Sequence, residues 1–212
     1  MYSIIYFLLS VYNMVLARFR LHKNTNEFNE RFGRPTKNRP RGDIIWVHCN
    51  DFSESYYVVG SILNVIPDKT VLVTYNSREA NNVNLWPNVI EQFAPIDACR
   101  PFSKFLKFWE PMMVIYVGSG IRPCHSHGLG RAQIPTFIVG GKIQDKRYKR
   151  WKLIRWFARH TMKNFKFIWA VNNKQTLRFA NLGAHDIVSM DVMHDSDANK
   201  IKEIIYKIRD FK

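Results

Sequence analysis

The sequence predicts an α/β protein with a Rossmann-like parallel sheet, and two features of the chain carry this prediction. Short apolar segments alternate with longer amphipathic segments through the whole body of the chain, which is the pattern of repeated strand–helix units. The apolar segments are also continuous rather than alternating, as in Ile44–His48. Continuous apolar strands are typical of a parallel sheet that helices cover on both faces.

The N-terminal segment Met1–Ala17 is almost wholly apolar or aromatic, and basic residues follow it at once. A secretory signal carries its positive charges before the apolar part, so residues 1–24 predict a membrane-anchor helix with the body on the cytoplasmic side. Such a helix reaches about 25 Å, short of the roughly 30 Å hydrocarbon core, and either spans a thinned bilayer or enters one leaflet. The alternative is a helix buried against the domain. The residues expected at the membrane are Phe7, Leu8, Leu9, Arg18, Arg20 and, further along, Trp151.

Residues 25–43 are rich in proline and basic residues and predict an exposed connector, and residues 44–212 form the expected Rossmann-like domain. Apolar runs bounded by turn residues predict its strands, and amphipathic spacing with proline and glycine stop signals predicts its helices. The expected strands are Ile44–His48, Val71–Tyr75, Ile90–Ala94, Met112–Val117, Thr136–Val139, Phe167–Val171 and Ile187–Met190. The expected helices run from Asp51 to Pro67 and over Arg78–Leu85, Pro101–Trp109, Asp145–Lys163, Lys174–Leu182 and Asn199–Phe211.

Glu54 stands three residues after Asp51, directly beyond the first expected strand, at the spacing of a helix-capping box. One interpretation is a capping carboxylate that interacts with the helix dipole and contributes about 0.3–1 kcal/mol. The other is a general base in a cleft, because ligands of open α/β sheets bind beyond the carboxyl ends of the strands. The local sequence leaves both interpretations open.

The net charge of +15 predicts anionic partners such as nucleic acid, phospholipid or phosphorylated glycolipid. Basic residues concentrate in the expected helix Asp145–Lys163, where Tyr148, Trp151 and Trp156 are interleaved with them. This pattern suits a membrane surface or phosphorylated lipid headgroups, but also nucleic acid or a solvated helix face. The expected anchor favours the lipid surface, and we do not expect nucleic acid as the partner.

Two short motifs invite a ligand. The cysteine and two histidines of Cys124–His125–Ser126–His127 suggest a metal site, and the alternative is histidines in a loop near a cleft. Because no second ligand pair stands at a matching distance, we expect no metal and no cofactor. Gly140–Gly141–Lys142 follows an expected strand and either lets a phosphate approach the backbone or is a plain strand–helix turn. The three cysteines have no paired spacing, which favours a reducing compartment.

The order and spacing of several segments match a known family. Besides the hydrophobic start, these segments are Arg31–Phe32–Gly33–Arg34–Pro35, Arg39–Pro40, Ile44–His48 leading to Glu54, Val71–Thr74, Gln92–Asp97, Phe105–Pro111, the loop near Pro123, Pro135–Gly140 and Arg178–Ala184. Together they resemble the N-terminal domain of the bacterial Kdo transferases, inner-membrane glycosyltransferases that move 3-deoxy-D-manno-octulosonic acid (Kdo) from its CMP-activated form onto a lipid A precursor. The resemblance implies a single Rossmann-like half, on the acceptor side, of a two-domain GT-B glycosyltransferase.

The family motifs are only partly retained. The first strand of the family ends in Ser-Val-Gly-Glu, whose glutamate is taken as the catalytic base, and this glutamate falls on Glu54. The family motif Glu-x-Glu-Leu-Trp-Pro-Asn falls on Gly118–Cys124, where both acids are lost and only the proline matches. The family motif Asn-Ala-Arg-x-Ser-Glu-Arg-Ser falls on Gly140–Arg147, where the charge is partly retained. The residues expected to bind the phosphorylated acceptor are Arg31, Asp51, Ser53, Lys142, Lys146, Arg147 and Arg150.

The family uses two Rossmann-like halves, and the C-terminal half binds the CMP sugar. This chain ends where that half would begin, so we do not expect an independent Kdo transferase. We expect a protein of lipid A and Kdo metabolism at the cytoplasmic face of the inner membrane, which binds lipid A or Kdo-lipid A and anionic lipids. It would act in Kdo transfer or removal with a second protein, either a transferase C-terminal half or a Kdo glycosidase. The alternative is a basic module for anionic surfaces or nucleic acid, without enzymatic activity.

Overall fold

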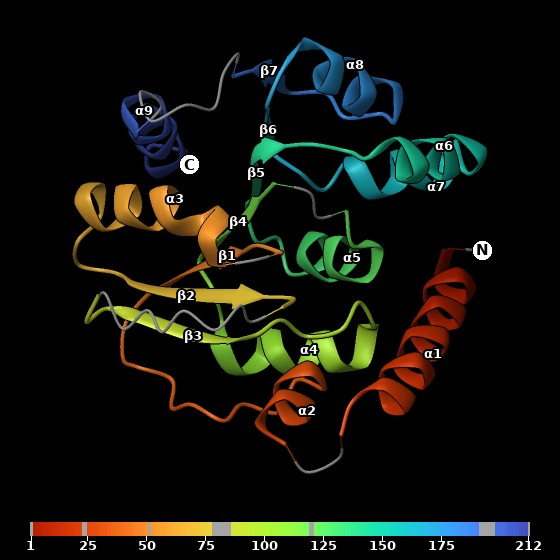
Figure 1. Cartoon of the computed structure of the whole chain (residues 1–212), viewed down its shortest axis with the longest axis horizontal. Helices are drawn as coiled ribbons and strands as arrows, with labels where there is room; N and C mark the ends of the chain where they lie inside the picture. The colour runs from red at the N-terminus through yellow and green to blue at the C-terminus, as the bar shows by residue number, and fades with distance from the viewer. Residues whose placement is uncertain are drawn as a thin grey trace.

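The computed structural model describes residues 2–22, 25–50, 52–77, 86–118, 121–190 and 198–211, apart from the side chains of Phe52, Glu54 and Ala198. Within these residues, seven parallel strands form one sheet in the order β3-β2-β1-β4-β5-β6-β7 (Figure 1). The strands are β1 (Ile44–His48), β2 (Thr70–Tyr75), β3 (Val89–Phe93), β4 (Met113–Val117), β5 (Thr136–Gly141), β6 (Phe167–Ala170) and β7 (Ile187–Ser189). The predicted parallel α/β fold is confirmed, while the helix predicted over Arg78–Leu85 lies outside the described residues.

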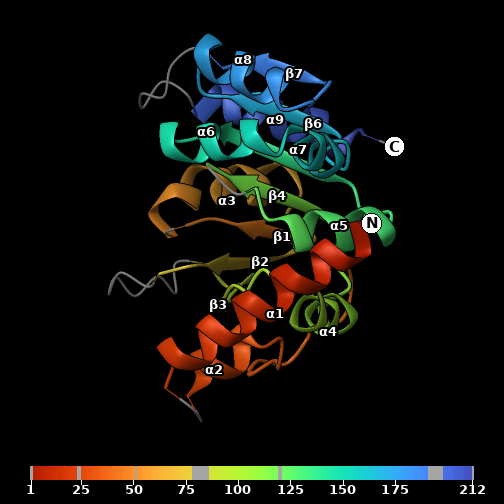
Figure 2. The same cartoon turned by 90° about the vertical axis from the view of Figure 1, so that its right-hand side faces the viewer.

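Helices cover both faces of the sheet. They are α1 (Tyr2–Arg20), α2 (Asn26–Arg31), α3 (Phe52–Val65), α4 (Cys99–Trp109), α5 (Pro123–Arg131), α6 (Asp145–Leu153), α7 (Arg155–Met162), α8 (Asn173–Asn181) and α9 (Ala198–Arg209). One face packs against α3 and α9 through Val59, Ile62 and Ile205. The other face packs against α4, α5, α7 and α8, and α1 lies outside α4 and α5 as a further layer (Figures 1 and 2).

Strand β1 shows how the sheet divides the core, because successive side chains of a strand point to opposite faces. Ile45 and Val47 pack toward α3 and α9, whereas Trp46 packs toward α4. The Trp46 ring is fully buried, lies 4.7 Å from the Phe105 ring between centroids, and donates its indole N–H to Thr74 Oγ1 at 2.8 Å. Truncating such an aromatic side chain typically costs about 3–5 kcal/mol, so Trp46 anchors the centre of the sheet.

Helix α1 attaches to the domain along a narrow seam. Tyr6, Ser10 and Ala17 are buried, and Ser10 Oγ accepts the backbone N–H of Cys99, the first residue of α4, at 2.9 Å. The exposed apolar side chains of α1 are Ile4, Phe7, Leu8, Val11, Tyr12, Val15 and Phe19. The helix is long and apolar enough to cross a membrane, and only 11% of it is buried against the body. It is therefore docked on the domain while its broad apolar face stays exposed.

The expected exposed connector, residues 25–43, contains helix α2, which is part of the fold. Thr25 Oγ1 accepts the backbone N–H of Phe28 at 3.1 Å and caps the helix, and the Phe28 ring is buried. The buried carboxylate of Glu30 accepts the backbone N–H of Phe93 at 2.7 Å. This bond satisfies a backbone donor at the end of β3 and fixes α2 at that edge of the sheet.

The single helix predicted over Asp145–Lys163 is wrong, because the chain breaks at Ile154 into α6 and α7. Ile154 leaves helical geometry with φ −116° and ψ 46°. Helix α7 buries Phe157 and Met162 in the core, whereas α6 buries none of its residues, all of which are described. The break lets α7 pack under the sheet while α6 lies at the sheet's carboxyl edge.

Candidate anion-binding site

The strand order reverses between β1 and β4, so the loops that leave these strands diverge. In open α/β sheets ligands bind at this switch point, beyond the carboxyl ends of the strands. The chain leaves β1 through Asn50 and β2 through Asn76. Asn76 donates its side-chain amide to Asn50 Oδ1 at 2.9 Å, and Asn50 O accepts the backbone N–H of Asn76 at 3.0 Å. These bonds join the two loops into one unit.

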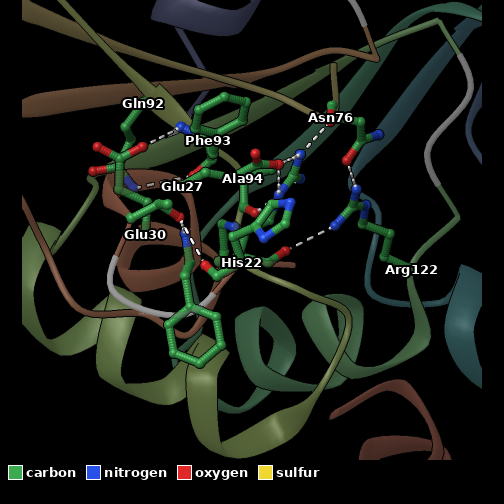
Figure 3. A network of polar contacts seen from close by, with 12 residues as sticks. His22, Glu27, Glu30, Asn76, Gln92, Phe93, Ala94 and Arg122 are labelled. Carbon is green, nitrogen blue, oxygen red and sulfur yellow. Dashed lines mark hydrogen bonds and ion pairs between the residues drawn. The ribbon is translucent and has the colours of Figure 1, made fainter. Parts of the chain in front are cut away.

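Arg122 lies at this edge, immediately before α5, and its guanidinium points toward Asn76 (Figure 3). Its guanidinium donates to Pro95 O at 2.9 Å and to the side-chain oxygen of Asn76. Burial lowers the pKa of Arg122, but a guanidinium starts from so high a pKa that it keeps its charge. Two fixed acceptors therefore hold a charged guanidinium at the switch point.

Arg31, the last residue of α2, reaches the same asparagine by a different atom. Its guanidinium donates to the backbone oxygen of Asn76 and to Ala94 O, the latter at 3.3 Å. Glu27 Oε1 accepts from Nε of Arg31 at 3.2 Å, and the guanidinium lies 4.9 Å above the centre of the Phe93 ring. Asn76 thus bridges two arginines, one through its backbone and one through its side chain.

Two adjoining cavities open around Asn76 and Arg122, which line both of them. The first, of about 310 Å³, is also lined by Arg147 and Arg150 of α6. The second, of about 490 Å³, is lined by Arg31 and by the C-terminal half of α1, including Asn13 and Arg20. We call the two cavities together the arginine cleft, after the arginines that line them: Arg20, Arg31, Arg122, Arg147 and Arg150.

The charges of the arginine cleft are unbalanced. Among its described lining residues, Asp97 is the single acid. Burial raises the pKa of Asp97 to about 6, and its carboxylate accepts the backbone N–H of His125 at 3.1 Å at the start of α5. Guanidinium groups bind phosphate and carboxylate through paired hydrogen bonds. The arrangement is therefore suited to an anionic ligand.

A row of polar side chains lies on the last rung of the sheet beneath the cleft. His48 is in register with Thr74 on one side and Tyr116 on the other, and its Nδ1 lies 3.0 Å from Thr74 Oγ1. Burial, reinforced by the charge of Arg122, lowers the pKa of His48 and His125 well below the usual value. Both rings are therefore neutral at physiological pH.

Three of the predicted acceptor-binding residues lie together in the cleft: Arg31, Arg147 and Arg150. Lys142 and Lys146 are exposed and lie outside the lining of both cavities. The structure thus concentrates the guanidinium groups at the switch point and leaves the two predicted lysines on the surface around it.

The predicted catalytic base lies near this edge along the chain. Glu54 belongs to the first turn of α3, which begins two residues after Asn50. Its side chain and the whole of Asp51 lie outside the described residues, so the role of Glu54 stays a prediction. Ser53 is exposed on the same turn.

The residues predicted at the membrane divide between two environments. Phe7 and Leu8 are exposed, as is Arg18, whereas Leu9 is half-buried on the seam of α1. Arg20 is exposed but also lines the cleft. The position of α1 thus brings the predicted membrane face and the cleft together.

Trp151 is half-buried rather than surface-exposed. Its ring stacks on Phe157 at 6.1 Å between centroids, and it lines the cleft. The exposed apolar side chains at this corner are Leu153, which is 85% exposed, Ile154 and Trp156. They adjoin α1, because the Tyr2 ring lies 5.5 Å from the Trp156 ring.

The sequence reasoning missed Arg122 and the two loop asparagines of the cleft, Asn50 and Asn76. The available signal was position: Arg122 follows the buried strand β4 and directly precedes Pro123, the first residue of α5. A residue before proline is held in extended geometry, here with φ −119° and ψ 102°. Without the strand order, however, nothing distinguishes this loop from others that leave a strand.

The two motifs left open have structural explanations. Gly140 has a positive φ of 66° beside an irregularity in the β5–β6 register, and a Cβ at Gly141 would lie 3.0 Å from the Phe179 ring. Both glycines lie at the end of strand β5, where backbone geometry and packing account for them. Cys124–His127, expected in a loop, lies in α5, where His125 is fully buried against Phe102.

The fold and the cleft define a Rossmann-like α/β domain with an arginine-lined cleft at the switch point of its sheet. The family model described as 3-deoxy-D-manno-octulosonic-acid transferase (kdotransferase) matches residues 26–195, and the chain belongs to this family. The resemblance drawn from the sequence motifs is thereby confirmed.

Curated relatives agree with this assignment. A 3-deoxy-D-manno-octulosonic acid transferase of Rickettsia felis is 30% identical over 153 residues, 69% of this chain and 33% of the relative. A probable mitochondrial 3-deoxy-D-manno-octulosonic acid transferase of Arabidopsis thaliana is 28% identical over 179 residues, 81% of this chain and 40% of the relative. The transferase of Rickettsia bellii is 23% identical over 89% of this chain and 47% of its own length. The chain therefore spans a third to a half of these relatives.

Proposed function

We propose that this chain is the acceptor-side half of a Kdo glycosyltransferase and that it binds the phosphorylated headgroup of lipid A or Kdo-lipid A in the arginine cleft. The observation that carries the proposal is that helix α1 forms one wall of the cleft through Asn13 and Arg20. A ligand with an anionic headgroup and acyl chains matches this site, because the guanidinium groups lie beside an exposed apolar helix face.

The same helix gives the proposed location, the cytoplasmic face of the bacterial inner membrane. A face of apolar side chains as exposed as that of α1 is stabilised by contact with lipid. The exposed corner formed by Leu153 and Trp156 lies next to its N-terminal end, among the basic residues of α6. Anionic lipids attract basic segments at about 1 kcal/mol per charge near the surface.

A second protein or domain completes the proposed reaction by supplying the sugar donor. The relatives are two to three times as long as the region that they share with this chain. In the proposed arrangement Glu54, at the start of α3, is the general base that takes the proton of the acceptor hydroxyl. The same acceptor site would also serve a partner that removes Kdo.

A vesicle-binding experiment tests the acceptor site. Arg147→Gln and Arg150→Gln each remove a cleft charge, and Lys149→Gln removes the same charge from α6 outside the cleft. A charged hydrogen bond is worth about 1.5–3 kcal/mol, so each arginine variant should weaken binding to vesicles containing bisphosphorylated lipid A by about 10-fold or more. Lys149→Gln should have a small effect, and dephosphorylated lipid A should bind all proteins weakly. Equal losses in the three variants would reject the cleft as the headgroup site.

The role of Glu54 is tested separately in cells. If Glu54 is the general base, Glu54→Gln should lower the Kdo content of lipid A relative to wild type, with unchanged binding to lipid A vesicles. Unchanged Kdo content would reject catalysis by Glu54 and leave the binding role intact. Retention of the protein in the soluble fraction, with salt-sensitive RNA binding, would instead favour the nucleic-acid alternative.

A further inference from the structure

Two thiols lie beneath α1, outside the arginine cleft and unused by the proposed function. Cys99 is the first residue of α4, and Cys124 is the second residue of α5. The sulfur of Cys124 lies 3.5 Å from Ser10 Oγ and 3.9 Å from Tyr6 O, and the sulfur of Cys99 lies 4.0 Å from the same Tyr6 oxygen. Each thiol is also the largest influence on the pKa of the other. The fold thus brings together two cysteines that are far apart in the sequence.

The surroundings of the two sulfurs shift the pKa values of their thiols in opposite directions. Both cysteines stand in the first turn of a helix, where the helix dipole favours a thiolate. The neighbouring Cys124 thiol lowers the pKa of Cys99 to about 6, and the Cys99 thiol together with burial raises the pKa of Cys124. These shifts favour Cys99 as the thiolate of the pair and Cys124 as the protonated partner.

Access favours Cys99 as the first sulfur to react. A cavity of about 750 Å³ is lined by both cysteines together with His127 and Arg131. Cys99 is half-buried, whereas Cys124 is 1% exposed, so a small reagent in the cavity meets Cys99 first. Cys49 directly follows β1 and is only 1% exposed, so its reactivity provides an internal comparison within the same chain.

We propose that Cys99 and Cys124 form a redox-active dithiol that a peroxide converts to a disulfide between α4 and α5, directly beneath α1. The Cys99 thiolate attacks the peroxide, so that an S–O bond forms, the O–O bond breaks and hydroxide leaves. Cys124 then attacks the oxidised sulfur, so that the S–S bond forms, the S–O bond breaks and the oxygen leaves as water with the proton of Cys124. The two thiols supply the two electrons that reduce the peroxide, and a dithiol reductant reverses the reaction.

Peptide mass spectrometry of the full chain after hydrogen peroxide treatment tests the proposal. The wild type should yield a Cys99–Cys124 linked peptide that dithiothreitol resolves, and Cys49→Ser should behave in the same way. Cys124→Ser should stop at a sulfenic acid on Cys99 that dimedone traps, and Cys99→Ser should leave Cys124 reduced. Circular dichroism verifies that each variant folds. Two unreacted thiols in the wild type, or oxidation of Cys49 at an equal rate, would overturn the proposal.

The pH dependence of alkylation tests the division of roles independently of disulfide formation. In Cys49→Ser, the rate at which iodoacetamide alkylates Cys99 should be nearly constant between pH 7 and 8.5, whereas an ordinary thiol with a pKa near 8.5 gains about 15-fold over this range. Cys124→Ser keeps a hydroxyl donor and should keep the flat profile, but Cys124→Ala removes the donor and should restore the rise. A steep profile in the parent protein, or the same profile in both variants, would contradict the assigned roles.

Discussion

Lowering the pH from 7 to 5 should destabilise the protein through the two histidines buried beneath the arginine cleft. In the unfolded chain His48 and His125 take up protons near pH 6.5. In the folded chain burial, together with the charge of Arg122, lowers their pKa well below that value. The unfolded state then binds more protons than the folded state, so the stability that is present above pH 6.5 is lost as the pH falls.

The size of the effect follows from the linkage between proton binding and folding. A histidine that stays neutral costs about 1.4 kcal/mol per pH unit below 6.5, so the two histidines cost about 4 kcal/mol at pH 5. Asp97 acts in the opposite direction, because burial raises its pKa to about 6. Its carboxylate takes up a proton in the folded state between pH 7 and pH 5, which stabilises the folded state by about 1.3 kcal/mol. The net expected loss from these three groups is about 2.7 kcal/mol.

Urea unfolding at pH 7 and pH 5 measures this loss, and His48→Asn isolates one contribution to it. Asparagine keeps an N–H donor toward Thr74 but cannot titrate, so the pH-dependent loss should shrink by about 2 kcal/mol. His185→Asn makes the same change at an exposed position and should leave the loss unchanged. If His48→Asn loses as much free energy of unfolding between the two pH values as wild type, the reasoning is refuted.

Three further predictions concern backbone geometry, ligand binding and the membrane. Gly33 has φ +71°, and a Cβ added there would lie 2.0 Å from a backbone oxygen of α4. Gly33→Ala should therefore lower the free energy of unfolding by about 2 kcal/mol or more in urea titration. Gly42→Ala, also at positive φ but in open space, should lower it less. Inorganic phosphate at ten times its dissociation constant should raise the melting temperature by about 3–6 °C over chloride at equal ionic strength, and Arg150→Gln should reduce this rise. Phe7→Asp places a charge on the exposed face of α1 and should reduce flotation with vesicles of anionic lipid; undiminished flotation would remove α1 from the membrane contact.

The sheet was predictable from the sequence because its strands carry their own signal. Ile44–His48 is a continuous apolar run and is buried at every position, so composition alone identifies it as an interior strand. Helix α2 was not predictable in the same way: it is six residues long, too short for a period to emerge from a basic, proline-rich stretch. Its stability comes from partners on β3, which local sequence does not show.

The break at Ile154 and the place of Arg122 show why the site was only partly predictable. The residues around Ile154 favour a helix locally, and the break arises because α7 packs into the core while α6 does not. Arg147 and Arg150 were predicted because basic residues cluster along α6, and Arg147 also because it falls on a charged motif of the family. Arg122 contributes a single charge next to a proline, and its importance depends on the strand order, which is a property of the whole sheet.

The concentration of positive charge in the arginine cleft destabilises the folded domain. Like charges repel across adjoining cavities, and the buried guanidinium of Arg122 loses hydration that Pro95 O and the Asn76 side chain replace without neutralising its charge. Asp97, the single acid among the described lining residues, already accepts the backbone N–H of His125 at the start of α5. Its backbone oxygen also accepts the side-chain amide of Asn13 at 2.8 Å and thereby fixes α1 against the cleft. An anion bound there would offset these charges, so the proposed ligand binding, the position of the apolar helix and the stability of the domain would depend on the same few contacts.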